Sequence, residues 1–320
     1  MSDGEFEIIE RYFAARPPER ADVLVGVGDD CAILAVPPGR QLAVSVDTMV
    51  VGVHFTTAMA PERIGHRSLA TSLSDLAAMG AEPAWATLAL TVPEADDRWL
   101  SEFSEGFAAL ASAHGMDLVG GDLTRGPLTV TVQVHGFVPD TGGLRRSGAR
   151  PGQRVVVTGT VGDAAGGLVC RRESAAATES ELDYLLDRFE LPTPRVGIGQ
   201  ALSGRACAAI DISDGLLQDL GHILRLSGVG AQIDADSVPR SPILRRVFGD
   251  EASLRMALSG GDDYELCFTC ELDVLDTLRN DIAAFGVTLT DIGMITHELG
   301  LRLVRGGMPW SIDSTGFNHF

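Results

Sequence analysis

The chain has 320 residues and a mass of 33.8 kDa, which is enough for two domains that each bury a core of their own. There are 25 basic residues against 44 acidic ones, and the formal net charge is −19. A chain this acidic repels phosphate backbones and anionic lipid. The composition therefore argues against nucleic acid and membrane surfaces as partners.

All 25 basic residues are arginine, and the chain contains no lysine. Lysine is required on the terminal phosphates in a Walker A loop, in the ATP-binding strand of a protein kinase, and for imine formation. The sequence therefore excludes a Walker A phosphate-binding loop, a protein-kinase ATP site and catalysis through a lysine imine.

The cysteines are odd in number and scattered, unlike a secreted disulfide framework. They are Cys31, Cys170, Cys207, Cys267 and Cys270. The N-terminal residues are acidic and amphipathic, and every apolar run ends well short of the roughly 18 residues of a membrane span. We therefore expect a cytoplasmic protein with neither an export signal nor a membrane span. The lone C-x-x-C pair lies in an apolar run, which favours core positions for both cysteines.

Apolar runs and helical spacing alternate in the first half of the chain. Strands are predicted at 23–28, 31–36, 42–47, 85–92 and 128–138, and helices at 61–80 and from Glu94 to about His114. Gly, Pro and Arg are then concentrated between Pro139 and Gly152, as in a linker. We place a domain boundary near residue 148.

The second half repeats this mixture. Strands are predicted at 154–160, 206–211 and 264–270, and helices from Asp163 and over 180–189, 213–228 and 272–286. Gly228 and Gly286 end two of these helices, and a capping box is predicted at Ser180 and Asp183. The predicted fold class is α+β, with two mixed α/β domains at residues 1–148 and 149–320.

Many aspartates stand where an apolar run ends beside Gly, Ser or Thr. They are Asp29, Asp30, Asp47, Asp122, Asp211, Asp214, Asp262 and Asp263, and Asp75 adds one inside a helical pattern. Strand ends in a mixed sheet converge on one edge, so several of these carboxylates could share a cleft. Oxygen ligands without His or Cys at fixed spacing favour Mg²⁺, which usually works with phosphates. The pattern indicates a nucleotide or phosphorylated substrate, and the alternative is ordinary turn and N-cap chemistry.

Other residues near these aspartates also have two interpretations. Gly120 and Gly121 could let backbone N–H groups approach an anion, or could simply turn the chain. Arg146 could clamp a phosphate in place of the missing lysine, or belong to a solvated linker. His54 could contact a phosphorylated substrate or form a structural hydrogen bond. The aromatic tail at 310–320 could fold back as a lid or dock on the core.

A series of segments, in this order and spacing, resembles the thiamine-monophosphate kinase family, in the superfamily of aminoimidazole ribonucleotide synthetase and selenophosphate synthetase. The resemblance covers nearly the whole chain. The segments are GEFEIIERYF, GVGDDCAIL, SVDTMVVGVHF, SLSDLAAMGAEPAW, GGDLTRGPL, RSGARPGQ, AIDISDGLLQDLGHI, SGGDDYELCF and GFNHF.

The resemblance implies a homodimer whose N-terminal domains join strands in an intersubunit β-barrel. It implies residues 1–148 as the domain for ATP, Mg²⁺ and dimerisation, and 149–320 as the domain that completes the active site. It assigns Mg²⁺ to Asp30, Ser45, the backbone of Val46, Asp47, Asp75, Asp122, Asp211 and Asp214. It assigns ATP to Gly121, Asp122, Arg146 and Ser213, and the thiamine phosphate to His54, Asp262 and Phe317. Asp262, Val46 and Phe317 stand where relatives often carry Glu, Thr, and Tyr or Trp.

The implied reaction is direct in-line transfer of the ATP γ-phosphoryl group to thiamine monophosphate, with ATP as co-substrate and several Mg²⁺ ions. Catalysis would rest on Asp47, Asp75 and Arg146. One rival is another ATP-dependent synthetase of the superfamily. Another is a non-catalytic nucleotide-binding dimer that regulates a partner, against which the intact aspartate set argues.

Overall fold

The computed structural model describes residues 4–14, 18–173, 175–313 and 316–317. The chain forms two compact units: unit 1 comprises Met1–Leu76 and Ala81–Gly142, and unit 2 comprises Ala77–Gly80 and Gly143–Phe320. The division after Gly142 lies on the N-terminal side of the boundary that we placed near residue 148. Among the described residues, no helix has both the length and the apolar character needed to cross a bilayer.

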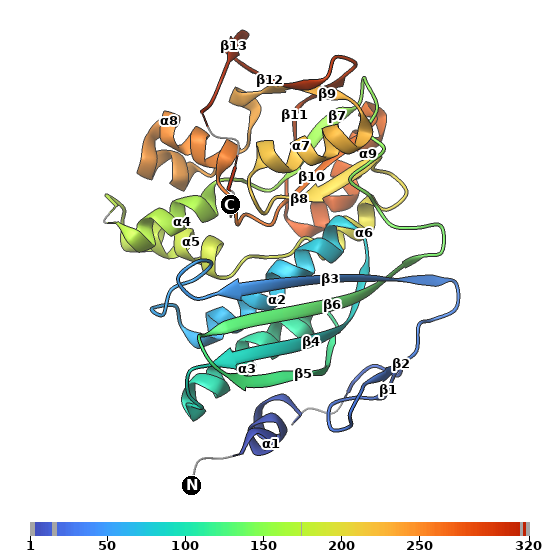
Figure 1. The fold of residues 1–320 in the computed structure, drawn as a ribbon. Coiled ribbons are helices and arrows are strands. Elements are labelled where there is room, and N and C mark those ends of the chain that lie inside the picture. Colours follow the sequence, from blue (N-terminus) through green and yellow to red (C-terminus); the bar gives the residue numbers. More distant parts are fainter. Residues whose placement is uncertain (1–3, 15–17, 174, 314–315, 318–320) are drawn as a thin grey trace. The chain divides into compact units, whose positions relative to one another are not determined.

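Unit 1 is built on a four-stranded sheet with the strand order β3-β6-β4-β5 (Figure 1). β4 and β5 run parallel, and the other neighbours are antiparallel. The strands are β3 (Arg40–Val50), β4 (Glu82–Val92), β5 (Asp117–Arg125) and β6 (Thr129–Pro139). The sheet is preceded by α1 (Glu5–Ile8), the π-helical turn η1 (Ile9–Phe13) and a small sheet of β1 (Val23–Val25) and β2 (Ile33–Leu34).

Two helices, α2 (Pro61–Ala78) and α3 (Asp97–Ala113), follow the predictions at 61–80 and from Glu94 to about His114. The main chains of these helices approach closely where each carries a glycine. A Cβ on Gly65 would lie 2.1 Å from the Phe103 carbonyl oxygen, and one on Gly106 would lie 2.0 Å from that of Glu62. Ser72 of α2 donates a hydrogen bond to the carbonyl oxygen of Val132 in β6, so α2 packs against the sheet.

β3 is an edge strand with two different faces. Ser45, Asp47 and Met49 share one face, and Met49 is buried there. The other face carries Leu42, Val44 and Val46, which are 43%, 53% and 56% exposed. In the described part of unit 1 the sheet is open, and the predicted intersubunit barrel stays a prediction that needs a second copy of the chain.

Unit 2 is built on a seven-stranded sheet with the order β13-β12-β9-β11-β7-β10-β8. Its strands are β7 (Arg154–Thr158), β8 (Ala208–Asp211), β9 (Gly230–Asp234), β10 (Leu266–Cys270), β11 (Leu289–Thr296), β12 (Gly300–Arg305) and β13 (Met308–Trp310). Its helices are α4 (Asp163–Arg172), α5 (Glu179–Glu190), α6 (Val196–Leu202), α7 (Leu216–Ser227), α8 (Pro242–Ser259) and α9 (Leu272–Ile282). Two short 3₁₀ turns, η2 (Ala235–Ser237) and η3 (Ala283–Phe285), complete the unit.

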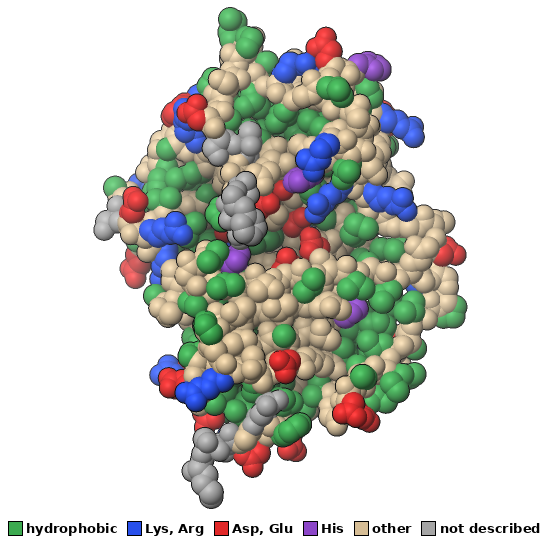
Figure 2. Space-filling view, in the orientation of Figure 1, with side chains coloured by type: hydrophobic (Ala, Val, Ile, Leu, Met, Phe, Trp, Pro, Cys, Tyr) green, Lys and Arg blue, Asp and Glu red, His purple; other side chains and the backbone are tan. Residues whose placement is uncertain are grey.

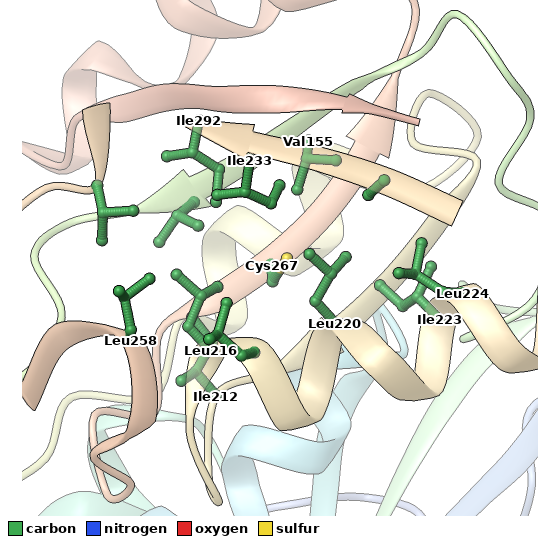
Figure 3. Packing of buried hydrophobic residues seen from close by; sticks show 14 of the residues in the cluster. Val155, Ile212, Leu216, Leu220, Ile223, Leu224, Ile233, Leu258, Cys267 and Ile292 are labelled. Carbon is green, nitrogen blue, oxygen red and sulfur yellow. The ribbon is translucent and has the colours of Figure 1, made fainter. Parts of the chain in front are cut away.

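The core of unit 2 lies between its sheet and α7 (Figure 3). Leu216, Leu220, Ile223 and Leu224 of α7 pack toward buried residues of the strands, among which is the Cys267 side chain. Burial also raises the pKa of Cys270 to about 12, so this thiol stays protonated. Both cysteines are buried, as predicted, and Gly228 ends α7, as predicted. The end predicted for α9 at Gly286 is displaced, because α9 stops at Ile282 and Gly286 follows the 3₁₀ turn η3 instead.

The capping box predicted at Ser180 and Asp183 is wrong by two residues. The box is formed by Thr178 and Glu181, because α5 begins at Glu179 and the N-cap is therefore Thr178.

Candidate functional site

In unit 1, β3 and α2 bring together two predicted carboxylates and a hydroxyl group. Ser45 of β3 donates a short hydrogen bond to the Asp75 carboxylate of α2. Asp47, two residues further along the same face of β3, interacts with Asp75 and with Ser72. Side chains two residues apart on a strand share a face, as Ser45 and Asp47 do on β3, and side chains one turn apart on a helix are neighbours, as Ser72 and Asp75 are on α2. These spacings place Ser45, Asp47 and Asp75 in one cluster.

Burial and the negative charge of Asp75 raise the pKa of Asp47 to about 6, against a hydrogen bond with Ser72 that lowers it. A buried carboxylate whose pKa is raised by a neighbouring negative charge marks a place where a cation is favourable. The oxygen donors of the cluster are the kind that Mg²⁺ prefers.

Two further predicted residues lie near this cluster in the sequence. The Val46 side chain points to the opposite, exposed face of β3, so only its main chain remains available for the predicted role. The Val50 N–H donates to Nδ1 of His54 over 3.0 Å. His54 therefore makes the structural hydrogen bond that we weighed as an alternative, and its Nε2 is the ring nitrogen left to carry a proton.

A second group of predicted residues in unit 1 lines a cavity of about 600 Å³. Asp30, Gly121 and Asp122 contribute to its wall, together with Thr87 and Leu88 of β4. The apolar side chains of Phe6, Ile9 and Phe13 line it as well. The cavity thus combines carboxylates with apolar surface, and its volume is typical of small-molecule sites.

The prediction that the aspartates mark strand ends is correct for Asp211, which is the last residue of β8, and wrong for Asp47 and Asp122. Asp47 lies inside β3 and Asp122 inside β5. The sequence predicted the strand of β3 only over 42–47 and predicted no strand over β5, because polar residues and glycines interrupt the apolar runs there. Gly121 does not turn the chain either: it lies within β5, where a Cβ would come 1.8 Å from the Leu88 carbonyl oxygen.

Unit 2 gathers most of its predicted residues around the loop that follows β8. The Asp262 N–H donates to the Ser213 carbonyl oxygen over 2.8 Å, and the Phe317 N–H donates to that of Asp214 over 2.9 Å. Asp211 is buried at the end of β8, directly before this loop. Main-chain hydrogen bonds therefore join this loop to segments that lie about 50 and about 100 residues further along the chain.

Asp262 has an unusual backbone conformation. Its φ is 70°, and that of Tyr264 is 49°, a region that residues other than glycine rarely adopt. The Tyr264 hydroxyl donates to the Asp262 carboxylate over 3.0 Å. Strained residues of this kind cluster at functional sites, so the strain adds a structural reason to consider Asp262. The sequence reasoning did not single out Tyr264.

Arg146 lies on the exposed surface of unit 2. The Arg145 carbonyl oxygen accepts the Ala209 N–H of β8 over 2.9 Å, which fixes this segment beside the sheet. Burial, Arg225 and Arg146 lower the pKa of His222, whereas Asp214 raises it, so Arg146 and Asp214 both act on one residue of α7. Figure 2 shows arginine side chains gathered over α7.

Within the described residues, no three Asp, Glu, His or Cys side chains converge into a group that could hold a metal by themselves. The predicted set instead forms smaller groups: Ser45, Asp47 and Asp75 interact with one another, and Asp30 and Asp122 line one cavity. Asp211, at the end of β8, and Asp214, in the loop that follows, belong to unit 2. The tail residues after Phe317 lie outside the described residues.

Comparison with known proteins identifies the class to which this two-unit architecture belongs. Residues 28–138 match the family described as AIR synthase related protein, N-terminal domain, and residues 150–305 match its C-terminal domain. The chain is therefore an AIR synthase-related protein.

Relatives that match the chain along its whole length identify the family within this class. The chain is 48% identical over 322 residues to the thiamine-monophosphate kinase of Salmonella typhimurium, covering 100% of this chain and 99% of the relative. The crystal structure of thiamine-monophosphate kinase from Stenotrophomonas maltophilia K279a is 46% identical, covers 95% of this chain and 97% of that one, and superposes with a TM-score of 0.88. AaThiL complexed with AMPPCP and TMP is 28% identical, covers 92% of both chains, and has a TM-score of 0.79. The chain belongs to the thiamine-monophosphate kinase family of enzymes.

Proposed function

We propose that this chain transfers the γ-phosphoryl group of ATP to the phosphate of thiamine monophosphate, giving thiamine diphosphate and ADP. The observation that carries the proposal is the match to thiamine-monophosphate kinases along the whole chain. The AaThiL complex with AMPPCP and TMP supports an ATP-like molecule and TMP as the two ligands.

In this proposal unit 1 binds the nucleotide with the cavity that contains Asp30, Gly121 and Asp122. The apolar wall from Phe6 to Phe13 suits a purine base, and the carboxylates suit a phosphate chain accompanied by cations. Arg146 and Ser213 of unit 2 supply a guanidinium and a hydroxyl group to the ATP phosphates.

The thiamine phosphate is bound by Asp262, Phe317 and His54. Phe317 is half exposed, and a phenyl ring can stack on a flat cationic heterocycle. The Asp262 carboxylate, which accepts the Tyr264 hydroxyl, contributes negative charge to the side of the ligand.

Mg²⁺ fits the residues present. The groups Ser45, Asp47 and Asp75, Asp30 and Asp122, and Asp211 and Asp214 would hold it, with the Val46 carbonyl as a further donor. Mg²⁺ commonly takes one or two protein carboxylates and completes its coordination with water and substrate phosphates, which agrees with groups this small. When bound, it neutralises negative charge on the phosphates.

The attacking group needs little help from a base. A phosphate monoester has a second pKa near 6 and is mostly dianionic at pH 7, so the acceptor oxygen is already a nucleophile. The tasks left to the protein are alignment and charge neutralisation for an in-line transfer, to which Arg146 contributes a fixed positive charge. This agrees with a chain that has no lysine.

The same proposal includes a homodimer in the cytoplasm. The exposed apolar face of the edge strand β3 supports it, because such an edge is a natural place for a second sheet to join. We keep residues 1–148 as the nucleotide-binding and dimerisation domain and 149–320 as the domain that completes the site.

The test is incubation of the purified protein with ATP, Mg²⁺ and thiamine monophosphate, followed by chromatography of the thiamine phosphates. We expect thiamine diphosphate only from the monophosphate and only with Mg²⁺, with thiamine and no-metal controls. ATP binding without any product would instead favour the non-catalytic dimer. ATP turnover with another acceptor of the superfamily would favour a different synthetase.

A further inference from the structure

One buried carboxylate organises the loop from Ser213 to Gly215. Oδ2 of Asp219, in the first turn of α7, accepts the N–H groups of Ser213, Asp214 and Gly215 over 3.0, 3.1 and 3.1 Å. Asp219 is only 3% exposed. Three successive N–H groups on one oxygen fix the path of this loop, and its Gly215 carbonyl oxygen accepts the Asp219 N–H at the start of α7.

The loop in turn positions two more segments. Its carbonyl oxygens at Ser213 and Asp214 accept the N–H groups of Asp262 and Phe317. Gln218, the neighbour of Asp219, donates from Nε2 to Asp214 Oδ2 over 3.3 Å and to the Phe317 carbonyl oxygen over 2.8 Å. A Cβ on Gly316 would lie 2.7 Å from the Asp214 carbonyl oxygen, so residues 316–317 lie directly against the loop.

These contacts define what the loop can offer to a ligand. Because its three N–H groups are occupied by Asp219, they are not available to cradle a phosphate, unlike those of a phosphate-binding loop. The Ser213 hydroxyl and the Asp214 carboxylate are the groups left to face a ligand. The loop therefore presents side chains rather than main-chain N–H groups to a ligand, because Asp219 accepts the N–H groups.

We propose that Asp219 is a positioning residue, which shapes the Ser213–Gly215 loop and through it places Ser213, Asp214, Asp262 and Phe317 for their ligands. The inference rests on the proposed function, since that function defines what these four residues bind. Asp219 is buried at the start of α7 and uses one oxygen for all three loop N–H groups, as expected for a group that orients the residues around it.

Hydrogen exchange of the ligand-free protein tests the first step without any activity. In the wild-type chain we expect the N–H groups of residues 213–215 to exchange slowly although they lie in a loop, and in the Asp219→Asn variant to exchange faster, while the strands of unit 2 stay protected. Rapid exchange in the wild-type protein, or unchanged exchange in the variant, overturns the proposal.

Kinetics test the second step. Since loss of a residue that orients ligand-binding groups typically costs about 10- to 100-fold, we expect Asp219→Asn to raise the KM for ATP and for thiamine monophosphate or lower kcat by this factor. Gln218→Ala removes the hydrogen bonds to Asp214 Oδ2 and to the Phe317 carbonyl oxygen but keeps the three contacts of Asp219, so it should raise the KM for thiamine monophosphate less than Asp219→Asn does. The control is Asp234→Asn, because Asp234 caps the distant turn η2 by accepting the Asp236 N–H over 3.1 Å.

The outcomes separate positioning from stability. A loss of activity in Asp219→Asn that follows the unfolded fraction, with both KM values unchanged, or faster exchange with wild-type kinetics, overturns the inference. If the wild-type protein makes no thiamine diphosphate, the proposed function fails, and the exchange experiment still decides whether Asp219 shapes the loop.

Discussion

Burial and the negative charge of Asp75 together raise the pKa of Asp47 to about 6, well above the usual value of 3.8. The two carboxylates come from different elements, Asp47 from β3 and Asp75 from α2. A pair of this kind is costly in the protein alone and becomes favourable when a cation lies beside it.

Asp47→Asn should therefore lower kcat by about a hundredfold or more, a loss comparable to that of other electrostatic contacts to a reacting group, without loss of folding. Steady-state kinetics at saturating Mg²⁺ and a melting curve measure the two effects. Near-normal turnover with a normal melting curve would remove Asp47 from the metal-binding set.

The same substitution should change the pH dependence of stability in metal-free protein. The folded-state pKa of Asp47 lies above its unfolded value, so the folded state binds more protons between about pH 4 and 6, and stability falls as the pH rises through this window. Asp47→Asn lacks this titration and should melt higher than the wild type at pH 7 in the presence of a chelator, with the difference shrinking toward pH 4. A variant that melts lower at pH 7 would contradict this.

Gly120 and Gly121 are adjacent glycines of β5, and only at Gly121 would a Cβ meet the main chain of β4. A Cβ on Gly121 would lie 1.8 Å from the Leu88 carbonyl oxygen, whereas one on Gly120 would meet nothing within 4 Å. We expect Gly121→Ala to destabilise unit 1 by about 1–3 kcal/mol or more through strand displacement, and Gly120→Ala to fold normally. Denaturant unfolding of both variants measures the difference, and equal stabilities would refute the close approach of β4 and β5.

Tyr264→Phe should weaken substrate binding more than it affects folding. The change deletes the hydroxyl that donates to Asp262, and a hydrogen bond of about 1 kcal/mol corresponds to a roughly fivefold rise in the KM for thiamine monophosphate. The KM for ATP should be unchanged. Tyr184→Phe is the control, since its hydroxyl donates to the buried Asp163 and its loss should lower the melting temperature without raising either KM.

The exposed face of β3 predicts how the proposed dimer can be broken. Val44 and Val46 point outward and are about half exposed in the isolated chain, so replacing both with Glu should leave unit 1 folded and give a monomer by sedimentation. Leu226→Glu on α7, a residue 56% exposed, is the control and should leave the assembly unchanged. A double variant that still sediments as a dimer would place the interface elsewhere.

Much of the fold could be predicted because hydrophobic periodicity is local. The pattern of α2, α3 and α7 gave their boundaries to within a few residues, and Gly228 ended α7 as its sequence indicated. β5 was missed, because the run DLVGGDLTR contains too few apolar residues to look like a strand and is held in place by pairing with β4.

The candidate site, like the fold, could be predicted only in part from the sequence. The family resemblance pointed to Asp47, Asp75, Asp214 and Asp262, since their types and spacing are visible in the sequence. Asp219 and Tyr264 were not singled out, because their roles depend on hydrogen bonds to residues that a one-dimensional pattern does not reveal as neighbours. A buried acidic residue four positions after Gly215, in an otherwise apolar helix face, is the signal that could have identified Asp219.

The assignment of Ala77–Gly80 to unit 2 has a consequence for how such proteins can be recombined. The Leu144 N–H donates to the Met79 carbonyl oxygen over 2.9 Å, and a Cβ on Gly199 would lie 1.9 Å from the Ala77 carbonyl oxygen. A chimaera joined once, after residue 142, would pair these four residues with a foreign second half. An exchange that keeps unit 2 intact therefore needs two additional crossovers around Ala77–Gly80, so that Met79 and Ala77 stay with the Leu144 and Gly199 that they contact.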